Sequence, residues 1–303
     1  MPSIFIFGLF PESSGKTILA TALARGLVNK GLDVAVFKPR SGHNMWYQYE
    51  AFLKCKAMRS LFCEDIIKLK EASGCPLPYE LLNPVDALLA PLNTEAFLEQ
   101  NLTRQMFLFE SDLYRHLITE RYLVSENERE KRILLVNERN IDANLVMLDQ
   151  DYLRELKANV DEIIPINSLG EWANLFNELG SKAIHSCYRR IKQEYNNLII
   201  EGFNDSVCPE PKLINEVNVV IGVAPGTAIL YDVDEFKRII NAMIKLNRDP
   251  RSLRSENIIT FTRKYETLKI PPVPPEYLKD YDELSEKLKE VIDRVNDQIE
   301  KAR

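Results

Sequence analysis

Residues 8–17 read GLFPESSGKT, and this stretch decides the fold. A short apolar run, residues 4–7, stands directly before it. Residues 16–30 follow with apolar side chains at helical spacing, so a helix is predicted there. A glycine-bearing loop that joins a strand to a helix and ends in Gly-Lys-Thr is the setting that a phosphate-binding loop requires.

The residue types in this loop suit phosphate chemistry. The backbone N–H groups of Ser13, Ser14 and Gly15 are predicted to point at phosphate oxygens, and Gly15 lets the backbone come close. Lys16 would supply a positive charge to the β- and γ-phosphates, and Thr17 a hydroxyl to Mg²⁺. The sequence therefore predicts that these five residues bind a nucleotide.

The loop departs from the usual pattern at one position. A glycine normally stands five residues before the second glycine, whereas here that place is Phe10 and the nearest glycine is Gly8. The alternative interpretation is an ordinary strand–turn–helix that contains Gly-Lys-Thr by chance. The position of the loop between a strand and a helix favours phosphate binding.

Composition limits the class of protein. The chain has 303 residues, 45% of them hydrophobic, with a formal net charge of −6, so it is predicted to be globular and to bind neither nucleic acid nor an anionic membrane. No apolar run approaches the ~20 residues of a membrane span. Five irregularly spaced cysteines and a first segment without a basic region favour reduced thiols, no signal peptide and a cytoplasmic protein.

The rest of the chain predicts an α/β fold. We expect a single domain, residues 1–303, with a three-layer α/β/α arrangement around a mostly parallel sheet, because apolar runs alternate with helical patterns. A segment rich in Leu, Glu and Lys, about 46–130, is predicted to be a helical insertion. The later strands are predicted at 32–37, 133–136, 162–166, 197–200, 217–223 and 257–262.

The amphipathic C-terminal segment, about 282–301, is predicted to form a helix. It packs either on its own sheet or on a second subunit. The first arrangement is favoured, and the second would make a homodimer.

A second group of polar residues follows the strand at 32–37. Lys38 and Arg40 suit an anionic substrate or a triphosphate, since the carboxyl ends of parallel strands face the ligand crevice. Ser41 and His43 are weaker substrate-binding candidates beside them. The alternative is a turn with solvated cations and a surface histidine.

A third motif ends the strand at 197–200. Glu201 stands where a carboxylate that organises Mg²⁺ belongs, and Gly202 leaves room for a phosphate. Taken alone, the motif fits a carboxylate that merely caps a strand equally well.

The order of these motifs resembles dethiobiotin synthetase and its relatives, which include the cobyrinic acid amide synthases and the deviant P-loop class of the Min-type ATPases. Gly-Lys-Thr comes first, Lys-Pro-x-x-Gly follows from Lys38, and an apolar strand then ends in Glu-Gly. Residues 219–228 look like the family's strand that ends in a Gly-Thr turn, at Gly226. The resemblance covers about residues 1–45 and 195–275, and not the segment between them.

The resemblance implies a role for each matching position. Lys16 and Thr17 look like the phosphate lysine and the magnesium hydroxyl, Lys38 like the lysine near the transferred phosphoryl group, and Glu201 like a carboxylate near the metal. The family's second metal carboxylate has two alternatives here, Glu50 and Asp65. The residue that reads the base also has two, Asn247 and the pair Thr262–Arg263.

The function expected from the resemblance is Mg-ATP binding by a ligase- or kinase-type enzyme with a small anionic acceptor. GTP is disfavoured because an Asn-Lys-x-Asp sequence is absent. The loop also lacks the early signature lysine of the Min-type branch, which counts against a membrane-cycling ATPase. The alternatives are a nucleotide-gated regulatory protein and a degenerate, inactive P-loop protein.

Overall fold

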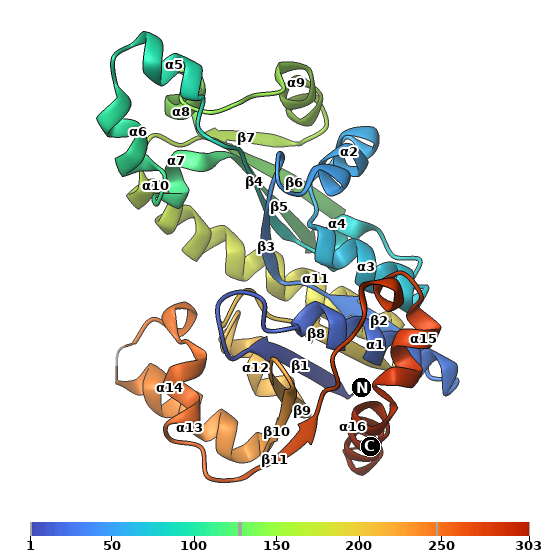
Figure 1. Cartoon of the computed structure of the whole chain (residues 1–303). Helices are drawn as coiled ribbons and strands as arrows, with labels where there is room; N and C mark the ends of the chain where they lie inside the picture. The colour runs from blue at the N-terminus through green and yellow to red at the C-terminus, as the bar shows by residue number, and fades with distance from the viewer. Residues whose placement is uncertain (1, 127–128, 247, 303) are drawn as a thin grey trace. The chain divides into compact units, whose positions relative to one another are not determined.

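A computed structural model describes residues 2–126, 129–246 and 248–302 of the chain (Figure 1). The protein is α/β, and it divides into two compact units, each with its own sheet. Unit 1 comprises Met1–Arg40, Asp65–Pro78 and Tyr188–Arg303. Unit 2 comprises Ser41–Glu64 and Tyr79–Cys187, so its sequence is inserted between the second and third parallel strands of unit 1.

The sheet of unit 1 is mixed, with the order β11-β10-β9-β1-β8-β2. Strands β2, β8, β1 and β9 are parallel to one another, whereas β10 and β11 are antiparallel additions. The bounds are β1 (Ser3–Gly8), β2 (Val34–Phe37), β8 (Asn197–Glu201), β9 (Val219–Ala224), β10 (Thr227–Tyr231) and β11 (Tyr265–Lys269). The parallel part confirms the strands predicted near 4–7, 32–37, 197–200 and 217–223.

The central strands are apolar on both faces, since every residue of β1, β2 and β8 is buried. Such strands need cover on both sides of the sheet. On one face, Phe7 packs against Phe236 of α13 (Val233–Lys245), with ring centroids 5.8 Å apart. Helix α1 (Lys16–Asn29) packs along β1, β2 and β8.

The C-terminal segment forms α15 (Tyr281–Lys287) and α16 (Lys289–Lys301), which pack side by side with α1 (Figure 1). Arg25 of α1 makes a two-pronged ion pair with Asp282, both of its contacts measuring 2.6 Å. The predicted helix is therefore present, and it lies on helix α1 of its own unit. The remaining helices of unit 1 are α3 (Glu64–Ser73), α12 (Pro211–Glu216), α14 (Ser255–Ile259) and two short 3₁₀ turns (Pro250–Ser252 and Pro275–Leu278).

The topology places four strand ends together. Because β1, β2, β8 and β9 run in the same direction, their carboxyl ends meet at one edge of the sheet, here called the carboxyl edge. The chain leaves β1 toward β2, while β9 lies on the other side of β1. A reversal of this kind is where open α/β sheets form their ligand crevice.

Unit 2 has a second mixed sheet, with the order β3-β4-β5-β6-β7. Its strands are β3 (Arg40–Asn44), β4 (Val85–Leu89), β5 (Leu117–Glu126), β6 (Arg129–Val136) and β7 (Glu162–Pro165). Its helices are α2 (Tyr49–Met58), α4 (Tyr79–Leu82), α5 (Thr94–Glu99), α6 (Thr103–Phe109), α7 (Leu113–His116), α8 (Glu138–Asp142), α9 (Gln150–Ala158) and α10 (Leu169–Leu175). Helix α10 continues through a π turn (Phe176–Gly180) into α11 (Ser181–Glu194), which belongs to unit 2 up to Cys187 and to unit 1 from Tyr188.

The segment about 46–130 is therefore not a purely helical insertion, because it contains the whole of β4 and β5. The sequence of β5 lacks the alternation of polar and apolar residues that identifies a strand, because the charged residues Glu120 and Arg121 are both buried. Arg121 donates to the carbonyls of Leu61, Asn83 and Pro84, and Glu120 accepts from Trp172. Internal hydrogen bonds of this kind make buried charges tolerable, and they depend on contacts remote in sequence.

The predicted strand at 257–262 is wrong. Residues 255–259 form α14, and the edge strand β11 begins only at Tyr265. Ile258 and Thr262 are both buried, and the Thr262 hydroxyl donates to the Ile258 carbonyl, so the spacing is helical. The sequence does not predict strand β11, because its residues alternate between exposed and half-buried positions.

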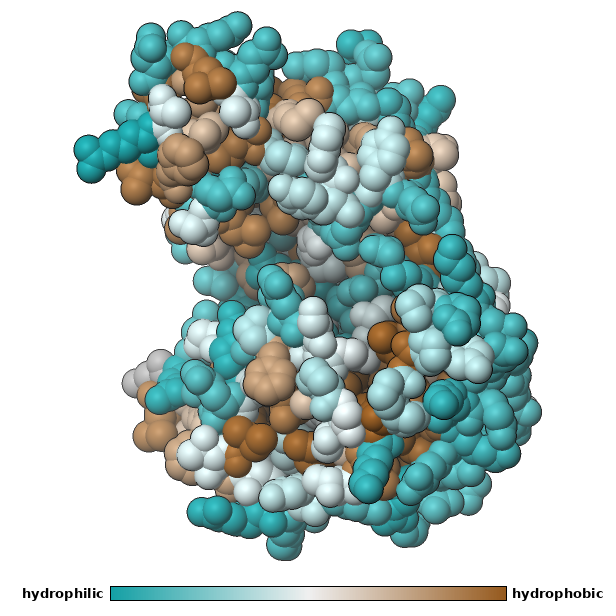
Figure 2. Space-filling model, in the orientation of Figure 1, coloured by the Kyte–Doolittle hydropathy of each residue, from teal (hydrophilic) through white to brown (hydrophobic). Residues whose placement is uncertain are grey.

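Within the described ranges, no helix is both long and apolar enough to cross a membrane. Some apolar side chains do reach the surface of unit 2. Figure 2 shows brown residues over α5 and α6, where Leu98, Phe107 and Leu108 are all more than half exposed.

The contact between α1 and α16 gives a test of the packing of unit 1. A Cβ placed on Gly26 would lie 2.8 Å from Cδ1 and 2.9 Å from Cγ2 of the buried Ile292. Gly26→Val should therefore lower the free energy of unfolding by about 1–3 kcal/mol through overpacking. Urea unfolding followed by circular dichroism measures the loss. Adding Ile292→Ala should restore part of it, and a double variant less stable than both single variants would contradict this packing.

Candidate functional site

Residues 8–17 wrap the amino end of α1 at the carboxyl edge of unit 1. The Leu9 amide donates to the Val223 carbonyl at 2.8 Å, which ties the loop to the end of β9. Ser13 and Gly15 both have positive φ angles, 53° and 87°. Gly15 is the N-cap of α1, and its carbonyl accepts from the Leu19 amide.

The loop leaves its backbone donors free. Among the described residues, none accepts a hydrogen bond from the backbone N–H groups of residues 12–18. The backbone N–H groups in the first turn of an α-helix have no partner within the helix. The left-handed conformations of Ser13 and Gly15 leave backbone N–H groups of the preceding loop unpaired as well. A concave run of backbone N–H groups at a helix start is an anion-binding geometry.

The structure explains why Phe10 can replace the usual glycine. Phe10 does not have a positive φ, and its side chain points outward with 54% of its surface exposed. The buried Ser14 hydroxyl donates to the Phe10 carbonyl at 2.7 Å and lies 3.1 Å from its amide. The close approach occurs at Gly8, where a Cβ would lie 2.8 Å from both the Phe10 carbonyl oxygen and Ser14 Oγ.

A buried ionic cluster lies beside the loop. Lys38, only 2% exposed, donates through Nζ to Asp65 Oδ2 and to Glu201 Oε1, both at 2.8 Å, and to the Gly202 carbonyl at 3.2 Å. The Thr17 hydroxyl lies 3.0 Å from Asp65 Oδ1 and 2.9 Å from Glu201 Oε1. The structure therefore brings Thr17, Lys38 and Glu201 together, as the sequence predicts.

The contacts of the cluster distinguish between Asp65 and Glu50, the two alternatives for the second metal carboxylate. Asp65 comes from the first turn of α3, where the chain returns to unit 1. Glu50 lies exposed on α2 of unit 2 and belongs to a different compact unit. Only Asp65 of these two contacts Thr17 and Lys38, although no sequence motif marks it.

The charges in the cluster perturb one another. Burial would raise the pKa of Asp65, but the adjacent Lys38 ammonium holds it below the ordinary value. Burial raises the pKa of Glu201, and Lys38 offsets this only in part. Burial and the nearby Lys38 charge lower the pKa of Lys16, against the opposing charges of Glu201, Asp65 and Asp205.

The donor set fits a magnesium ion. Thr17, Asp65 and Glu201 present oxygen atoms, and Glu201 Oε2 is buried with no hydrogen-bond partner in the described part of the chain. No group of three or more His, Cys, Asp or Glu side chains among the described residues could hold a metal ion. Mg²⁺ does not need one, because it keeps several waters and uses one or two carboxylates together with substrate phosphates.

The two predicted glycines also lie at the carboxyl edge. Gly202 follows β8, and a Cβ there would lie 3.2 Å from the Phe5 ring and from the Ser206 carbonyl. Gly226 has a φ of 80° in the turn between β9 and β10. It lines a cavity of about 590 Å³ with Thr227, Lys269 and residues at the start of α16.

The residues after Lys38 divide between the units. Arg40 is half-buried in unit 1, whereas Ser41 and His43 are buried in unit 2. Asp86 accepts a 2.6 Å hydrogen bond from the Ser41 hydroxyl and lies 2.8 Å from His43 Nδ1. The histidine is therefore a buried partner of Asp86 and not a surface residue.

Only one of the two alternatives for the base-reading residue lies within the described residues. Asn247 lies outside the described residues. The Thr262 hydroxyl is bonded to the Ile258 carbonyl, and the Arg263 amide donates to Glu235. Glu235 starts α13 just after β10, which ends at the edge opposite the carboxyl edge.

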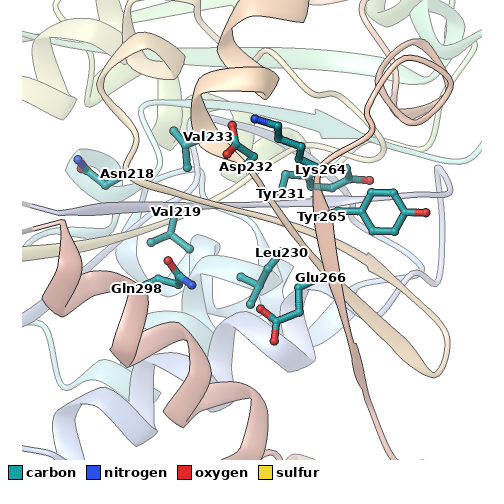
Figure 3. Close-up of a pocket in the computed structure, with 10 residues that line it drawn as sticks. All are labelled: Asn218, Val219, Leu230, Tyr231, Asp232, Val233, Lys264, Tyr265, Glu266 and Gln298. Carbon is teal, nitrogen blue, oxygen red and sulfur yellow. The ribbon is translucent and has the colours of Figure 1, made fainter.

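A second cavity, of about 250 Å³, lies at that opposite edge (Figure 3). It is lined by the start of β9, the end of β10 and the start of β11, including Asn218, Tyr231 and Glu266. Its polar groups are largely engaged, since Asn218 accepts from the Ser3 amide and Glu266 pairs with Arg294. The candidate site is therefore the cluster of Thr17, Lys38, Asp65 and Glu201 beside the loop at residues 8–17, and not this cavity.

No protein-family model matches the chain, and no curated protein matches it. The resemblance to dethiobiotin synthetase stays a prediction from the motifs. The geometry of the loop and the cluster is the independent observation.

The pair of His43 and Asp86 gives a pH-dependent test of unit 2. Burial opposes the charged form of His43, but Asp86 outweighs it and raises the pKa to about 10. Because the pKa in the folded protein exceeds the ordinary histidine value of 6.5, the pair's contribution to stability is full below about pH 6.5. It should be lost as the pH rises toward 10.

Two measurements check this. The imidazole ¹⁵N signals should show a protonated ring at pH 8, assigned by comparison with His43→Gln. The free energy of unfolding in urea should fall between neutral and alkaline pH, with a shallower slope in that variant. A His43 ring that is neutral at pH 8 would contradict the ion pair.

Proposed function

We propose that the protein binds Mg-ATP at the carboxyl edge of unit 1 and uses it for phosphoryl transfer. The observation that carries the proposal is the convergence of free N–H groups at residues 12–18 with Lys16 and with the cluster of Thr17, Lys38, Asp65 and Glu201. Donors for phosphate oxygens and oxygen ligands for magnesium lie next to each other, which suits a metal-bound polyphosphate.

Each group has a distinct role in this proposal. The loop amides and Lys16 bind the β- and γ-phosphates. Thr17, Asp65 and Glu201 hold Mg²⁺ directly or through water, and the ion would neutralise charge on the phosphates. Lys38 supplies a second positive charge to the transferred group, because such reactions are catalysed mainly by positioning and by charge stabilisation.

The motif order supports an ATP-dependent ligase- or kinase-type enzyme with a small anionic acceptor. ATP is preferred over GTP because an Asn-Lys-x-Asp sequence is absent. The contacts also argue against a degenerate loop. Asp65 supplies the second carboxylate, and Ser14 fixes the backbone at Phe10 without a glycine.

Isothermal titration with ATP and Mg²⁺ tests the proposal. The wild type should bind in the micromolar range and only weakly without Mg²⁺. Lys16→Ala should weaken binding about ten- to a hundredfold, because it removes one charged hydrogen bond to phosphate. GTP should compete poorly.

Lys30→Ala is the matched control, since this lysine follows the other end of α1 and pairs with Asp293. Its titration should match the wild type. Wild-type protein that does not bind Mg-ATP would overturn the proposal, and the resemblance would then reflect ancestry alone.

One observation favours a nucleotide-gated protein as the second candidate. The chain leaves unit 1 two residues after Lys38 and returns to it at Asp65, so two cluster residues stand where the chain passes between the units. A nucleotide that moves these residues could transmit a change to unit 2.

Turnover separates the two candidates. A screen of carboxylate, carbamate and hydroxyl compounds for stimulated ADP release should find at least one that raises the rate well above basal hydrolysis. Glu201→Gln should abolish that stimulation. Tight Mg-ATP binding with no stimulation, together with nucleotide-dependent protection of unit 2 amides from hydrogen exchange, would instead favour the gated protein.

A further inference from the structure

The first half of the phosphate loop is held by two other segments of unit 1. The Gly8 amide donates to the Asn204 carbonyl at 3.4 Å. The Ser255 hydroxyl donates to the Leu9 carbonyl at 2.7 Å, and the Ser255 amide donates to the Asp205 carbonyl at 3.0 Å. The segments 8–10, 204–207 and 253–255 are therefore each bonded to both of the others, and we call them the loop clamp.

The clamp carries one exposed cation, Arg254. Its Nε lies 3.7 Å from Asp205 Oδ1, which is an ion pair beyond hydrogen-bond distance. The Arg254 side chain is 42% exposed, whereas the Asp205 side chain is only 14% exposed. The guanidinium group is thus held loosely at its inner end and is accessible to a ligand.

The partner of Arg254, Asp205, directly follows Asn204, whose carbonyl accepts from the Gly8 amide at the start of the loop. The negative charge of Asp205 is close enough to Lys16 to favour its protonated form, although burial and Lys38 act in the opposite direction. The Lys16 ammonium itself lies 3.0 Å from the point that a Cβ of Gly8 would occupy. Asp205 therefore lies next to the start of the loop, where its charge acts on Lys16, and it also pairs with Arg254.

We propose that Arg254 is a specificity-determining cation that recognises the terminal phosphate of the bound nucleotide. The inference rests on the proposed function. A triphosphate beside Lys16 carries more negative charge than Asp205, and guanidinium groups bind phosphate oxygens in a two-pronged manner. Arg254 then exchanges its loose contact with Asp205 for the terminal phosphate, and the adjacent Ser255 anchors it to the loop.

Titration of Arg254→Ala with Mg-ATP and with Mg-ADP tests this. Loss of a charged hydrogen bond to the terminal phosphate should weaken Mg-ATP binding about ten- to a hundredfold. Mg-ADP binding should change by less than about twofold, because ADP lacks that phosphate. Arg254→Lys should lie between, since lysine keeps the charge without the planar fork.

Two further variants serve as controls. Arg238→Ala removes an exposed arginine of α13 that pairs with Glu235, and its binding of both nucleotides should match the wild type. Asp205→Asn should bind Mg-ATP at least as tightly as the wild type, because it removes a carboxylate that competes for Arg254 and Lys16.

The outcomes are distinguishable. If wild-type protein binds no Mg-ATP, the proposed function itself fails. If the wild type binds but Arg254→Ala loses ATP and ADP equally, Arg254 merely supports the loop and the inference is overturned. Unchanged affinity for both nucleotides overturns it too. Thermal unfolding of each variant shows whether unit 1 remains folded.

Discussion

The site depends on one buried ammonium group, that of Lys38. A lysine that is almost fully buried is costly unless its charge is compensated, and here Asp65 and Glu201 both compensate it at 2.8 Å. The same two carboxylates accept the Thr17 hydroxyl. Four elements, β2, α3, β8 and α1, therefore meet through three mutually dependent charges. Removing the Lys38 ammonium would leave the two carboxylates without compensation, and an uncompensated buried charge typically costs about 3–5 kcal/mol.

Part of this cluster can be predicted from the sequence, because it depends on elements that are consecutive in the chain or on the direction of parallel strands. Strand β1, the loop at residues 8–17 and α1 are consecutive, and parallel strands bring their carboxyl ends to one edge, so Thr17, Lys38 and Glu201 are predictable together. Asp65 is different. It reaches the cluster only because the chain returns from unit 2 into α3 at that point, which no periodicity reveals. Arg254 and Ser255 were likewise hidden, since α14 resembles a strand in sequence.

In unit 2, buried charged residues limit how much of the fold can be predicted from the sequence. Its strand β5 carries Glu120 and Arg121 inside the core, which breaks the alternation that identifies a strand. These charges are satisfied by Trp172 and by carbonyls near residue 83, contacts that exist only after folding. His43 follows the same logic, because Asp86 makes a buried position acceptable for a side chain that the sequence alone places at the surface. Where polar side chains are buried with a partner, hydrophobic patterns in the sequence therefore do not predict which residues are buried.

The shared use of carboxylates also constrains how the site can be filled. Lys38 cannot keep both Asp65 and Glu201 and also turn to a phosphate oxygen, so a phosphate alone would leave carboxylates without compensation. A divalent cation alone would compete with Lys38 and leave a buried ammonium group poorly paired. In the proposed function, a cation and a phosphate together would satisfy all the charges, since the cation would take over the carboxylates and Lys38 would turn to the phosphate. If the proposed function holds, the ion pairs of the cluster would thus couple the binding of the metal to that of the nucleotide.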